Sequence, residues 1–292
     1  MNHKAGFISI LGSPNVGKST LMNALVGEKL SIITSKAQTT RHRIMGIVNG
    51  DDFQIVYSDT PGIITPHYLL HKAMMKFIDK AMEDSDLFLL VTEMHEDFPH
   101  QDFLEKLKSL SIPVIVLINK IDLSDPAGVE KKFTEWHEKL PQADIIPVSA
   151  LYKANLEKVL EIILEKLPEN PPFFPKDELT DRSMRFFVSE MIREKILLLY
   201  KKEIPYCTEI AIDSFKEEEK ITRISATIFV ARDSQKPILI GHQGNAIKKL
   251  GTEARKEIEA FLEKHIFLEL SVKVNKDWRD SERELKRFGY ES

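Results

Sequence analysis

The sequence predicts two domains: an α/β domain with a mostly parallel six-stranded sheet and one antiparallel edge strand, and a smaller α+β domain after it. In the first half, short apolar runs alternate with helical patterns, which is typical of a parallel sheet wrapped by helices. A proline-rich stretch ends this alternation, and the second half follows a different order of elements. The 292 residues also exceed what one core usually organises.

Six strands are expected in the first domain. They are expected at 7–11, 44–48, 53–58, 87–92, 113–118 and 145–148, with helices near 19–26, 70–81, 102–110, 129–140 and 156–167. The second and third strands are separated only by Asn-Gly-Asp-Asp at 49–52, which is a hairpin signal. We therefore expect these two strands to be antiparallel at one edge of the sheet.

The proline-rich stretch at 168–175 holds four prolines in eight residues and favours an extended, semi-rigid spacer. We place the first domain at 1–170, the linker at 171–180 and the second domain at 181–292. The second domain is expected to contain a helix at 183–201, strands at 208–215 and 223–231, a strand-like Pro-Ile-Leu-Ile run at 237–240, a helix ending near 264, a strand at 267–274 and a short charged tail helix.

The composition is ordinary for a water-soluble globular protein, with 42% hydrophobic and 29% charged residues. No run approaches the ~20 apolar residues of a membrane-spanning helix. The net charge is −4, divided as −6 over residues 1–179 and +2 over the rest, so overall charge does not indicate a nucleic-acid-binding protein. The single cysteine, Cys207, excludes an internal disulfide and fits a reducing cytoplasm.

Residues 12–19, Gly-Ser-Pro-Asn-Val-Gly-Lys-Ser, have the pattern of a phosphate-binding loop between a strand and a helix. Its glycines let backbone N–H groups face phosphate oxygens at the positive end of the next helix. Lys18 is expected to reach the β- and γ-phosphates, and the Ser19 hydroxyl to bind Mg²⁺. The expected nucleotide contacts in this loop are Gly12, Ser13, Pro14, Asn15, Val16, Gly17, Lys18, Ser19 and Thr20.

The motif Asn-Lys-Ile-Asp at 119–122 directly follows an apolar strand and selects the base. The Asp122 carboxylate can accept hydrogen bonds from N1–H and the 2-amino group of guanine, and adenine offers neither donor there. A wrong base leaves polar groups unpaired, which is costly. Asn119 and Lys120 are expected to brace the base, and Ser149 with a backbone N–H at Ala150 to close over it.

Asp-Thr-Pro-Gly at 59–62 ends another strand and is expected to face the γ-phosphate. Between the motifs lies Gln-Thr-Thr-Arg-His-Arg at 38–43, where one threonine must supply a ligand to Mg²⁺, and Thr40 is favoured over Thr39. The further nucleotide contacts expected are Asp59, Thr60, Pro61 and Gly62. The expected metal ligands are Ser19, Thr40 and Asp59, and the expected catalytic groups are Lys18, Thr40 and Gly62.

These motifs, together with Val-Ser-Ala at 148–150, resemble those of the Era family of GTPases. The match extends through Lys-Glu-Ile-Pro-Tyr at 202–206 and Val-Lys-Val-Asn-Lys-Asp-Trp-Arg-Asp at 272–280, and so covers nearly the whole chain. The resemblance implies a P-loop GTPase domain, a type II K-homology domain, and GTP or GDP as ligand. It also implies binding near the 3′ end of 16S ribosomal RNA and a role in assembling the small ribosomal subunit.

Two residues refine the expected chemistry. Ile63 lies where Ras-like enzymes place a water-orienting glutamine, so slow hydrolysis of GTP is implied. His42 and His67 lie nearby in the sequence but are expected to face solvent. Asn15 matches the asparagine that coordinates K⁺ in related potassium-activated GTPases, and a K⁺ site there and a purely loop-shaping role are both open.

Gly-His-Gln-Gly at 241–244 resembles the loop with which K-homology domains clamp four nucleotides. The motif alone indicates only a glycine turn, but residues 232–256 hold six Lys or Arg against two acids, which favours RNA. Era proteins usually carry Lys-Gly between the glycines, so one positive charge is lost here at neutral pH. The expected RNA contacts are Gly241, His242, Gln243, Gly244, Lys248 and Lys249.

The leading hypothesis is a cytoplasmic, monomeric GTP-driven RNA-binding switch whose two phosphate sites act independently across the linker. The alternative is a GTP-gated adaptor at the inner face of the membrane or at the cell-division machinery, and the low basicity lends it weight. A nucleotide kinase is disfavoured, because the motif at 119–122 has no use there. Phe288 and Tyr290 either stack on bases or pack within the protein.

Overall fold

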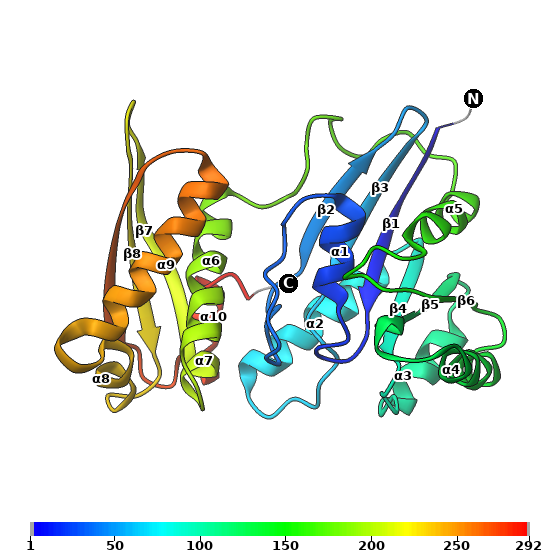
Figure 1. Ribbon diagram of the computed structural model, residues 1–292, viewed down its shortest axis with the longest axis horizontal. Helices are drawn as coiled ribbons and strands as arrows, with labels where there is room; N and C mark the ends of the chain where they lie inside the picture. Colours follow the sequence, from blue (N-terminus) through cyan, green and yellow to red (C-terminus); the bar gives the residue numbers. More distant parts are fainter. Residues whose placement is uncertain (1–2, 291–292) are drawn as a thin grey trace.

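The computed structural model describes residues 3–290, which fold into two adjoining domains (Figure 1). The sheet of the first domain has the strand order β2-β3-β1-β4-β5-β6. Its strands are β1 (Lys4–Leu11), β2 (Ile44–Asn49), β3 (Phe53–Asp59), β4 (Leu87–Glu93), β5 (Val114–Asn119) and β6 (Asp144–Pro147). Only β2 runs antiparallel to its neighbour, which confirms the predicted edge hairpin.

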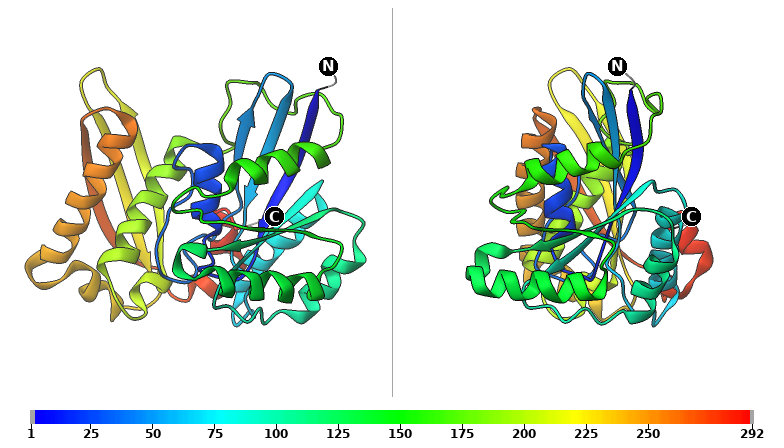
Figure 2. Two further views of the ribbon diagram at one scale, coloured as in Figure 1. Left: turned by 45° about the vertical axis from the view of Figure 1, so that its right-hand side comes forward. Right: turned by 90° about the vertical axis from the view of Figure 1, so that its right-hand side faces the viewer.

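Helices cover both faces of this sheet (Figure 2). They are α1 (Lys18–Val26), α2 (Leu69–Glu83), α3 (Gln101–Ser109), α4 (Pro126–Lys139) and α5 (Leu156–Lys166), with a short 3₁₀ turn η1 at Ile121–Leu123. Helices α1 and α5 share one apolar cluster with Ile8 and Leu89, whereas α3 and α4 enclose a second cluster around Trp136. A parallel sheet covered on both faces needs strands that are apolar on both sides, as these are.

The second domain has a three-stranded sheet in the order β7-β8-β9, with β7–β8 antiparallel and β8–β9 parallel. Helices α6 and α9 pack on one another and on this sheet. The elements are α6 (Met184–Leu199), α7 (Ile204–Cys207), β7 (Thr208–Glu217), β8 (Thr222–Val230), α8 (Gln235–Ile240), η2 (His242–Gly244), α9 (Asn245–Leu262), β9 (Ile266–Val274), η3 (Trp278–Asp280) and α10 (Glu282–Arg287). Among residues 3–290, no helix combines the length and apolarity that crossing a bilayer requires.

One predicted element of the second domain is wrong. The Pro-Ile-Leu-Ile run at 237–240 lies in helix α8 and not in a strand. Within it, Leu239 is fully buried and Ile238 is exposed. Four apolar residues are too few for periodicity to distinguish a strand from a buried helical turn.

The proline-rich linker does not keep the two domains apart. The side-chain oxygen of Gln54 in β3 accepts hydrogen bonds from the backbone of Phe173 at 2.7 Å and of Phe174 at 3.0 Å. The ring of Phe173 also lies 4.8 Å from that of Phe7 in β1. The linker is therefore held against β1 and β3 of the first sheet, and the second domain packs directly on the first.

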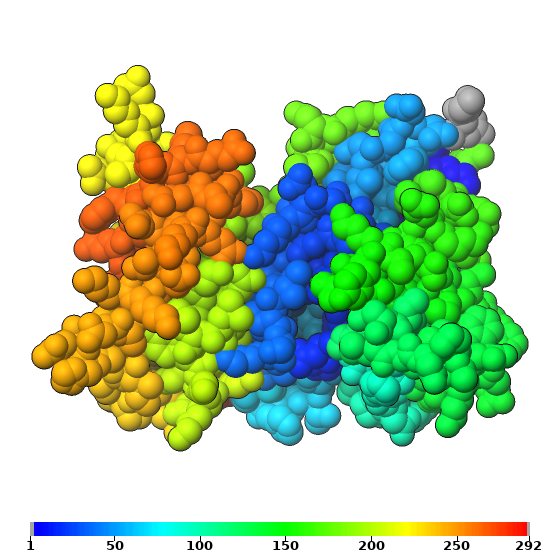
Figure 3. Space-filling model, in the orientation of Figure 1, coloured from blue at the N-terminus to red at the C-terminus, as the bar shows by residue number. Residues whose placement is uncertain are grey.

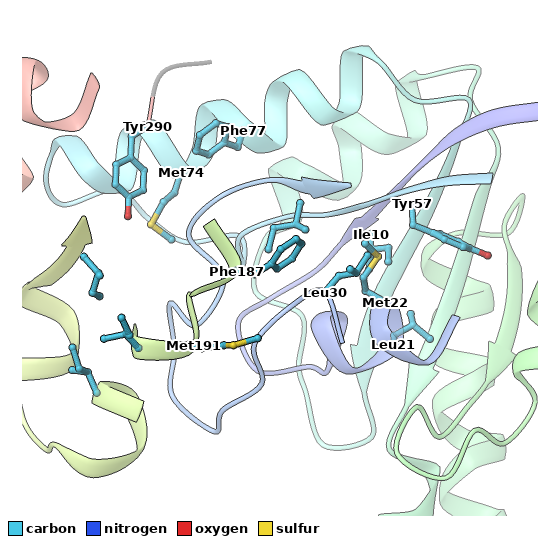
Figure 4. Packing of buried hydrophobic residues seen from close by; sticks show 14 of the residues in the cluster. Ile10, Leu21, Met22, Leu30, Tyr57, Met74, Phe77, Phe187, Met191 and Tyr290 are labelled. Atoms are coloured by element: carbon cyan, nitrogen blue, oxygen red, sulfur yellow. The ribbon is translucent and has the colours of Figure 1, made fainter. Parts of the chain in front are cut away.

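One of the two apolar clusters, the one that contains Ile8 and Leu89, extends across both domains. Figure 4 shows Phe187 and Met191 of α6 near the segment that carries Leu30, and Tyr290 near Met74 of α2. Because the domains share this core, the predicted independence of the two phosphate sites does not follow from the chain's architecture.

Candidate nucleotide and RNA sites

The register of the first sheet brings the sequence motifs together at one edge. Ile10 of β1 pairs with Asp59 of β3, so the phosphate loop and the Asp-Thr-Pro-Gly motif start side by side. Glu93 of β4 pairs with Asn119 of β5, and the base motif follows at the same level. The carboxyl ends of parallel strands are where such sheets bind ligands.

A cavity of about 280 Å³ opens at this edge. In Figure 3 it appears as a hollow between the blue segment before β2 and the green loops after β5 and β6. Its lining residues are Pro14, Asn15, Gly17, Lys18, Ser19, Thr20, Ile32, Ile33, Thr34, Ser35, Gln38, Thr39, Thr40, Gly62 and Lys120. Residues 32–35 are not among the predicted contacts, because they carry no motif and are marked only by their position just before the loop at 38–43.

Lys18 is held inside the phosphate loop and is only 6% exposed. Its Nζ donates hydrogen bonds to the carbonyl oxygens of Gly12 at 3.0 Å and Ser13 at 2.7 Å. Burial lowers the pKa of Lys18 to about 8, although the charges of Asp59 and Glu96 oppose this shift. The ammonium group is therefore still mostly charged at neutral pH, and it can exchange the two carbonyls for phosphate oxygens.

Two glycines leave no room for a side chain. A Cβ at Gly17, where φ is +98°, would lie 2.3 Å from Nδ2 of Asn119. A Cβ at Gly62 would lie 2.7 Å from the backbone nitrogen of Pro14. The backbone at Gly17 and at Gly62 can thus approach a ligand closely, as a phosphate cradle requires.

Three oxygen atoms meet at the expected metal position. Ser19 Oγ lies 2.7 Å from Thr40 Oγ1 and 2.7 Å from Asp59 Oδ2, and Thr40 Oγ1 lies 3.4 Å from the same Asp59 oxygen. The other carboxylate oxygen, Asp59 Oδ1, is buried without a hydrogen-bond partner in the described part of the chain. Two hydroxyls and a carboxylate are hard ligands of the kind Mg²⁺ prefers, so these residues fit the ion.

The two candidate threonines have different surroundings. Thr39 Oγ1 is engaged with Thr34 Oγ1 at 2.7 Å and with the carbonyl of Lys36 at 2.6 Å. Thr40 Oγ1 instead points to Ser19 and Asp59. The geometry therefore favours Thr40 as the metal ligand.

The base end of the site is built around Asn119. Its Nδ2 donates to the carbonyl of Val16 at 2.8 Å, and its Oδ1 accepts from the Ala150 N–H at 2.9 Å, which ties the phosphate loop to the segment after β6. Ser149 Oγ lies 2.5 Å from Asp122 Oδ1 and holds this exposed carboxylate in place. To contact guanine, the Ala150 N–H would have to share or exchange its bond to Asn119.

Lys120 closes the same end of the cavity. Its Nζ donates to the carbonyl of Asn15 at 2.8 Å and forms an ion pair with Glu93. Asn15 itself is exposed and left-handed at φ +67°. The lysine stem therefore lies between the phosphate loop and the base motif, where it can cover a bound nucleoside.

The structure places Ile63, His42 and His67 differently from one another. Ile63 donates its backbone N–H to Gly12 at 3.1 Å, and its side chain is buried in the apolar cluster around Trp136. The prediction that His42 faces solvent is wrong, because the second domain covers it and leaves it 7% exposed. His67 is exposed, as predicted.

His42 lies against the end of the chain. Its ring stacks on Tyr290 at 4.3 Å between centroids, and its Nε2 lies 3.2 Å from the carbonyl oxygen of Phe288. Tyr290 is buried, and the Phe288 ring packs 5.5 Å from that of Trp278. Of the two alternatives for Phe288 and Tyr290, the structure therefore favours packing within the protein over stacking on bases.

The loop at 241–244 exposes its backbone at the start of α9. Gly241, Gln243 and Gly244 all have positive φ, at +75°, +51° and +77°. His242 and Gln243 are exposed. Because the loop ends at the amino terminus of an 18-residue helix, it can present N–H groups and a positive dipole to a phosphate chain.

A groove of about 340 Å³ continues from this loop between α9 and β9. Its lining residues are Ile247, Lys248, Gly251, Thr252, Arg255, Leu268 and Leu270. Lys248 lines the groove, whereas Lys249 is exposed outside it. Arg255 is not among the predicted RNA contacts, although the spacing of Ile247, Gly251 and Arg255 by four residues marks one face of a helix. Apolar side chains beside two cations suit bases and phosphates of a single strand.

Comparisons with known proteins agree with this arrangement. A 50S ribosome-binding GTPase family matches residues 7–120, and the KH domain family matches residues 203–279. The GTPase Era of Clostridium kluyveri is 43% identical over 290 residues, covering 98% of this chain and 99% of that protein. The GTPase Era of Syntrophus aciditrophicus is 45% identical over 291 residues, covering 98% and 95%.

The chain belongs to the Era family of GTPases. Two solved Era structures match it along nearly its whole length, each with a TM-score of 0.95 and 38% identity, covering 99% of this chain and 100% of the other. One is Era in complex with MgGDPNP and nucleotides 1506–1542 of 16S ribosomal RNA, and the other is a variant of Aquifex aeolicus Era bound to GDP·AlF4⁻. Membership of the Era family confirms the predicted GTPase activity and the P-loop and K-homology domains.

Proposed function

We propose that this chain is a GTP-driven switch that binds 16S ribosomal RNA near its 3′ end and assists assembly of the small ribosomal subunit. The observation that carries the proposal is that a nucleotide cavity and a K-homology groove occur in one chain with a continuous core. The similar Era structure that holds MgGDPNP together with 16S ribosomal RNA supports the same pairing of ligands.

In this proposal, the phosphate loop at 12–20 cradles the β- and γ-phosphates and Lys18 neutralises their charge. Ser19, Thr40 and Asp59 would hold Mg²⁺, which supplies positive charge beside the β- and γ-phosphate oxygens. The Gly62 N–H faces the γ-phosphate. These groups bind and orient GTP but do not abstract a proton from water.

Intrinsic hydrolysis of GTP is expected to be slow because two candidate side chains for orienting the attacking water are turned away from the nucleotide. Among the described residues, Ile63 turns its side chain into the core and His42 is covered by the second domain, so neither can orient water. The exposed Asn15 is suitably placed at the loop to hold K⁺, which would add a fixed positive charge as negative charge develops on the phosphates.

At the other end of the cavity, Asp122 selects guanine. Ser149 keeps this selector in position through its hydrogen bond to Asp122, and Asn119 fixes the neighbouring segment through its bond to the Ala150 N–H. A carboxylate held this way is complementary to the two guanine donors and repels the acceptor atoms of other bases.

The second domain supplies the RNA contacts. The backbone at 241–244 would clamp the sugar–phosphate chain, and Lys248 and Arg255 would neutralise phosphates along the groove. Arg255 compensates for the lysine that is absent between the two loop glycines. We propose that the protein acts as a monomer in the cytoplasm and that any contact with the inner face of the membrane is peripheral.

Crosslinking to RNA in cells, followed by sequencing of the bound fragments, tests this function. The expected fragments cluster at the 3′ end of 16S ribosomal RNA and become much less frequent with a Gly244→Asp variant. If the fragments are spread over unrelated RNAs, and binding to liposomes persists after nuclease treatment, the membrane-adaptor alternative is correct instead.

A further inference from the structure

The K-homology domain binds the loop at 38–43 through hydrogen bonds on the amino-terminal side of Thr40. Arg193, in the middle of α6, donates hydrogen bonds from its guanidinium to the carbonyl oxygens of Thr39 and, at 3.5 Å, of Gln38. The Thr39 carbonyl belongs to the peptide bond that leads into Thr40. Fixing this peptide therefore limits where the Thr40 hydroxyl can lie.

The same domain also binds the loop on the carboxyl-terminal side of Thr40, through Arg41. Arg41 is fully buried in the second domain, where it donates to the carbonyl of Thr208 at 2.8 Å and pairs with Glu209 at 3.2 Å. The Tyr290 hydroxyl donates to the same Glu209 carboxylate at 2.6 Å. Arginine contacts thus tie the chain to the K-homology domain on both sides of Thr40: Arg193 of that domain binds the residue before it, and Arg41, the residue after it, binds into that domain.

Arg193 is itself rigidly held. Its Nε donates to Glu190 Oε1 at 2.7 Å, and its Nη2 pairs with the other oxygen of that carboxylate. Both side chains are almost completely buried. A planar guanidinium paired on one edge with a carboxylate has its remaining donors fixed in direction, which lysine cannot reproduce.

We propose that Arg193 is a positioning residue for the triphosphate, which acts from the RNA-binding domain by holding Thr40 at the Mg²⁺ site. In GTPases this loop is ordered by the γ-phosphate and Mg²⁺ and is released after hydrolysis. A group that stabilises the ordered loop therefore favours Mg²⁺·GTP over GDP. By reciprocity, bound Mg²⁺·GTP favours the domain arrangement in which Arg193 meets the loop. This inference rests on the proposed role of Thr40.

Binding of fluorescent GDPNP and GDP during a Mg²⁺ titration tests the inference. Arg193→Lys keeps a positive charge beside Glu190 but loses the planar guanidinium that bonds to two groups at once. The double variant Glu190→Gln with Arg193→Gln removes both charges of this buried pair. Both should raise the Mg²⁺ concentration needed for GDPNP binding by about tenfold, the effect of losing one charged hydrogen bond. Affinity for GDP should not change. Arg185→Ala is the matched control, because Arg185 lies on the same helix but contacts Ile212 of β7 and should leave both ligands unaffected.

Thr40→Val separates the possible failures. If Thr40→Val raises the Mg²⁺ requirement and the Arg193 variants do not, Arg193 has no positioning role and the metal site stands. If Thr40→Val also has no effect, the assignment of Thr40 is wrong and the inference falls with it. If the Arg193 variants weaken the binding of GDP and of GDPNP equally, they disturb the structure of the whole nucleotide site, and the inference is again overturned.

Discussion

Gly244→Asp should weaken RNA binding without unfolding the protein. Gly244 has φ +77° directly before α9, and a Cβ added there meets no atom of residues 3–290 within 4 Å. The substitution therefore costs only the strain of a left-handed backbone, about 1 kcal/mol, and Asp tolerates this conformation better than most residues. The same change one turn earlier would behave differently, because a Cβ at Gly241 would lie 2.6 Å from that of Ala246.

The expected loss of RNA affinity has two parts. The new carboxylate can accept the N–H groups at the start of α9, which removes a phosphate contact that is worth about 1 kcal/mol. It also places a negative charge next to the phosphate chain, and two such charges about 4 Å apart repel by about 1 kcal/mol in water. Together, about 2 kcal/mol corresponds to roughly a thirtyfold weaker Kd.

Filter binding of single-stranded fragments from the 3′ end of 16S ribosomal RNA, at several salt concentrations, measures this loss. Gly244→Asn is the matched control, because it has the same size and a similar backbone tolerance but no charge, and it should lose only part of the affinity. The salt dependence should become shallower as one phosphate contact is removed. If Gly244→Asp binds RNA like the unmodified chain, the loop is only a helix start and the RNA site lies elsewhere.

Asp122→Asn should shift the preference from guanine toward xanthine nucleotides, because an amide can donate to the 2-oxygen of xanthine; equal binding of ATP and GTP by the unmodified chain would contradict this base selection. Lys18→Ala should abolish tight GTP binding while circular dichroism stays native, and retained affinity would rule out the cradle. Replacing Na⁺ with K⁺ should speed hydrolysis if Asn15 binds the cation, and identical rates would leave it a loop-shaping residue. Burial lowers the pKa of His42, so the unfolded chain takes up the proton first and stability falls as the pH drops through about 6.5. Thermal unfolding of His42→Phe should lose part of this pH dependence, and an unchanged profile would assign it to other groups.

The fold and most of the nucleotide site could be predicted because their signals are local. The phosphate loop, the Asp59–Gly62 segment and the base motif each combine a short string with the end of an apolar run. Parallel pairing then brings these ends together whatever the exact bounds of the strands. The preference for Thr40 over Thr39 agrees with the structure, in which the Thr40 hydroxyl contacts Ser19 and Asp59.

The contacts between the domains could not be predicted in this way. His42 and Arg41 contact partners that lie more than a hundred residues away in the sequence, and Tyr290 contacts Glu209, which lies 81 residues away. No periodic pattern marks such pairs. The prolines predict an extended linker, but they do not indicate which side chain binds it, because Gln54 lies in a strand whose sequence looks ordinary. The consequence is functional, since these contacts join the nucleotide loop to the RNA-binding domain.

The most direct test of the proposed switch is the affinity of one protein sample for the 16S ribosomal RNA 3′-end fragment, measured once with Mg²⁺·GDPNP and once with GDP. The contacts of Arg193 and Arg41 with the loop around Thr40 link the ordered nucleotide site to the position of the K-homology domain. RNA is therefore expected to bind more tightly to the GDPNP-loaded protein. Equal affinity in the two nucleotide states would contradict it, because the GTP site and the RNA groove would then be energetically independent.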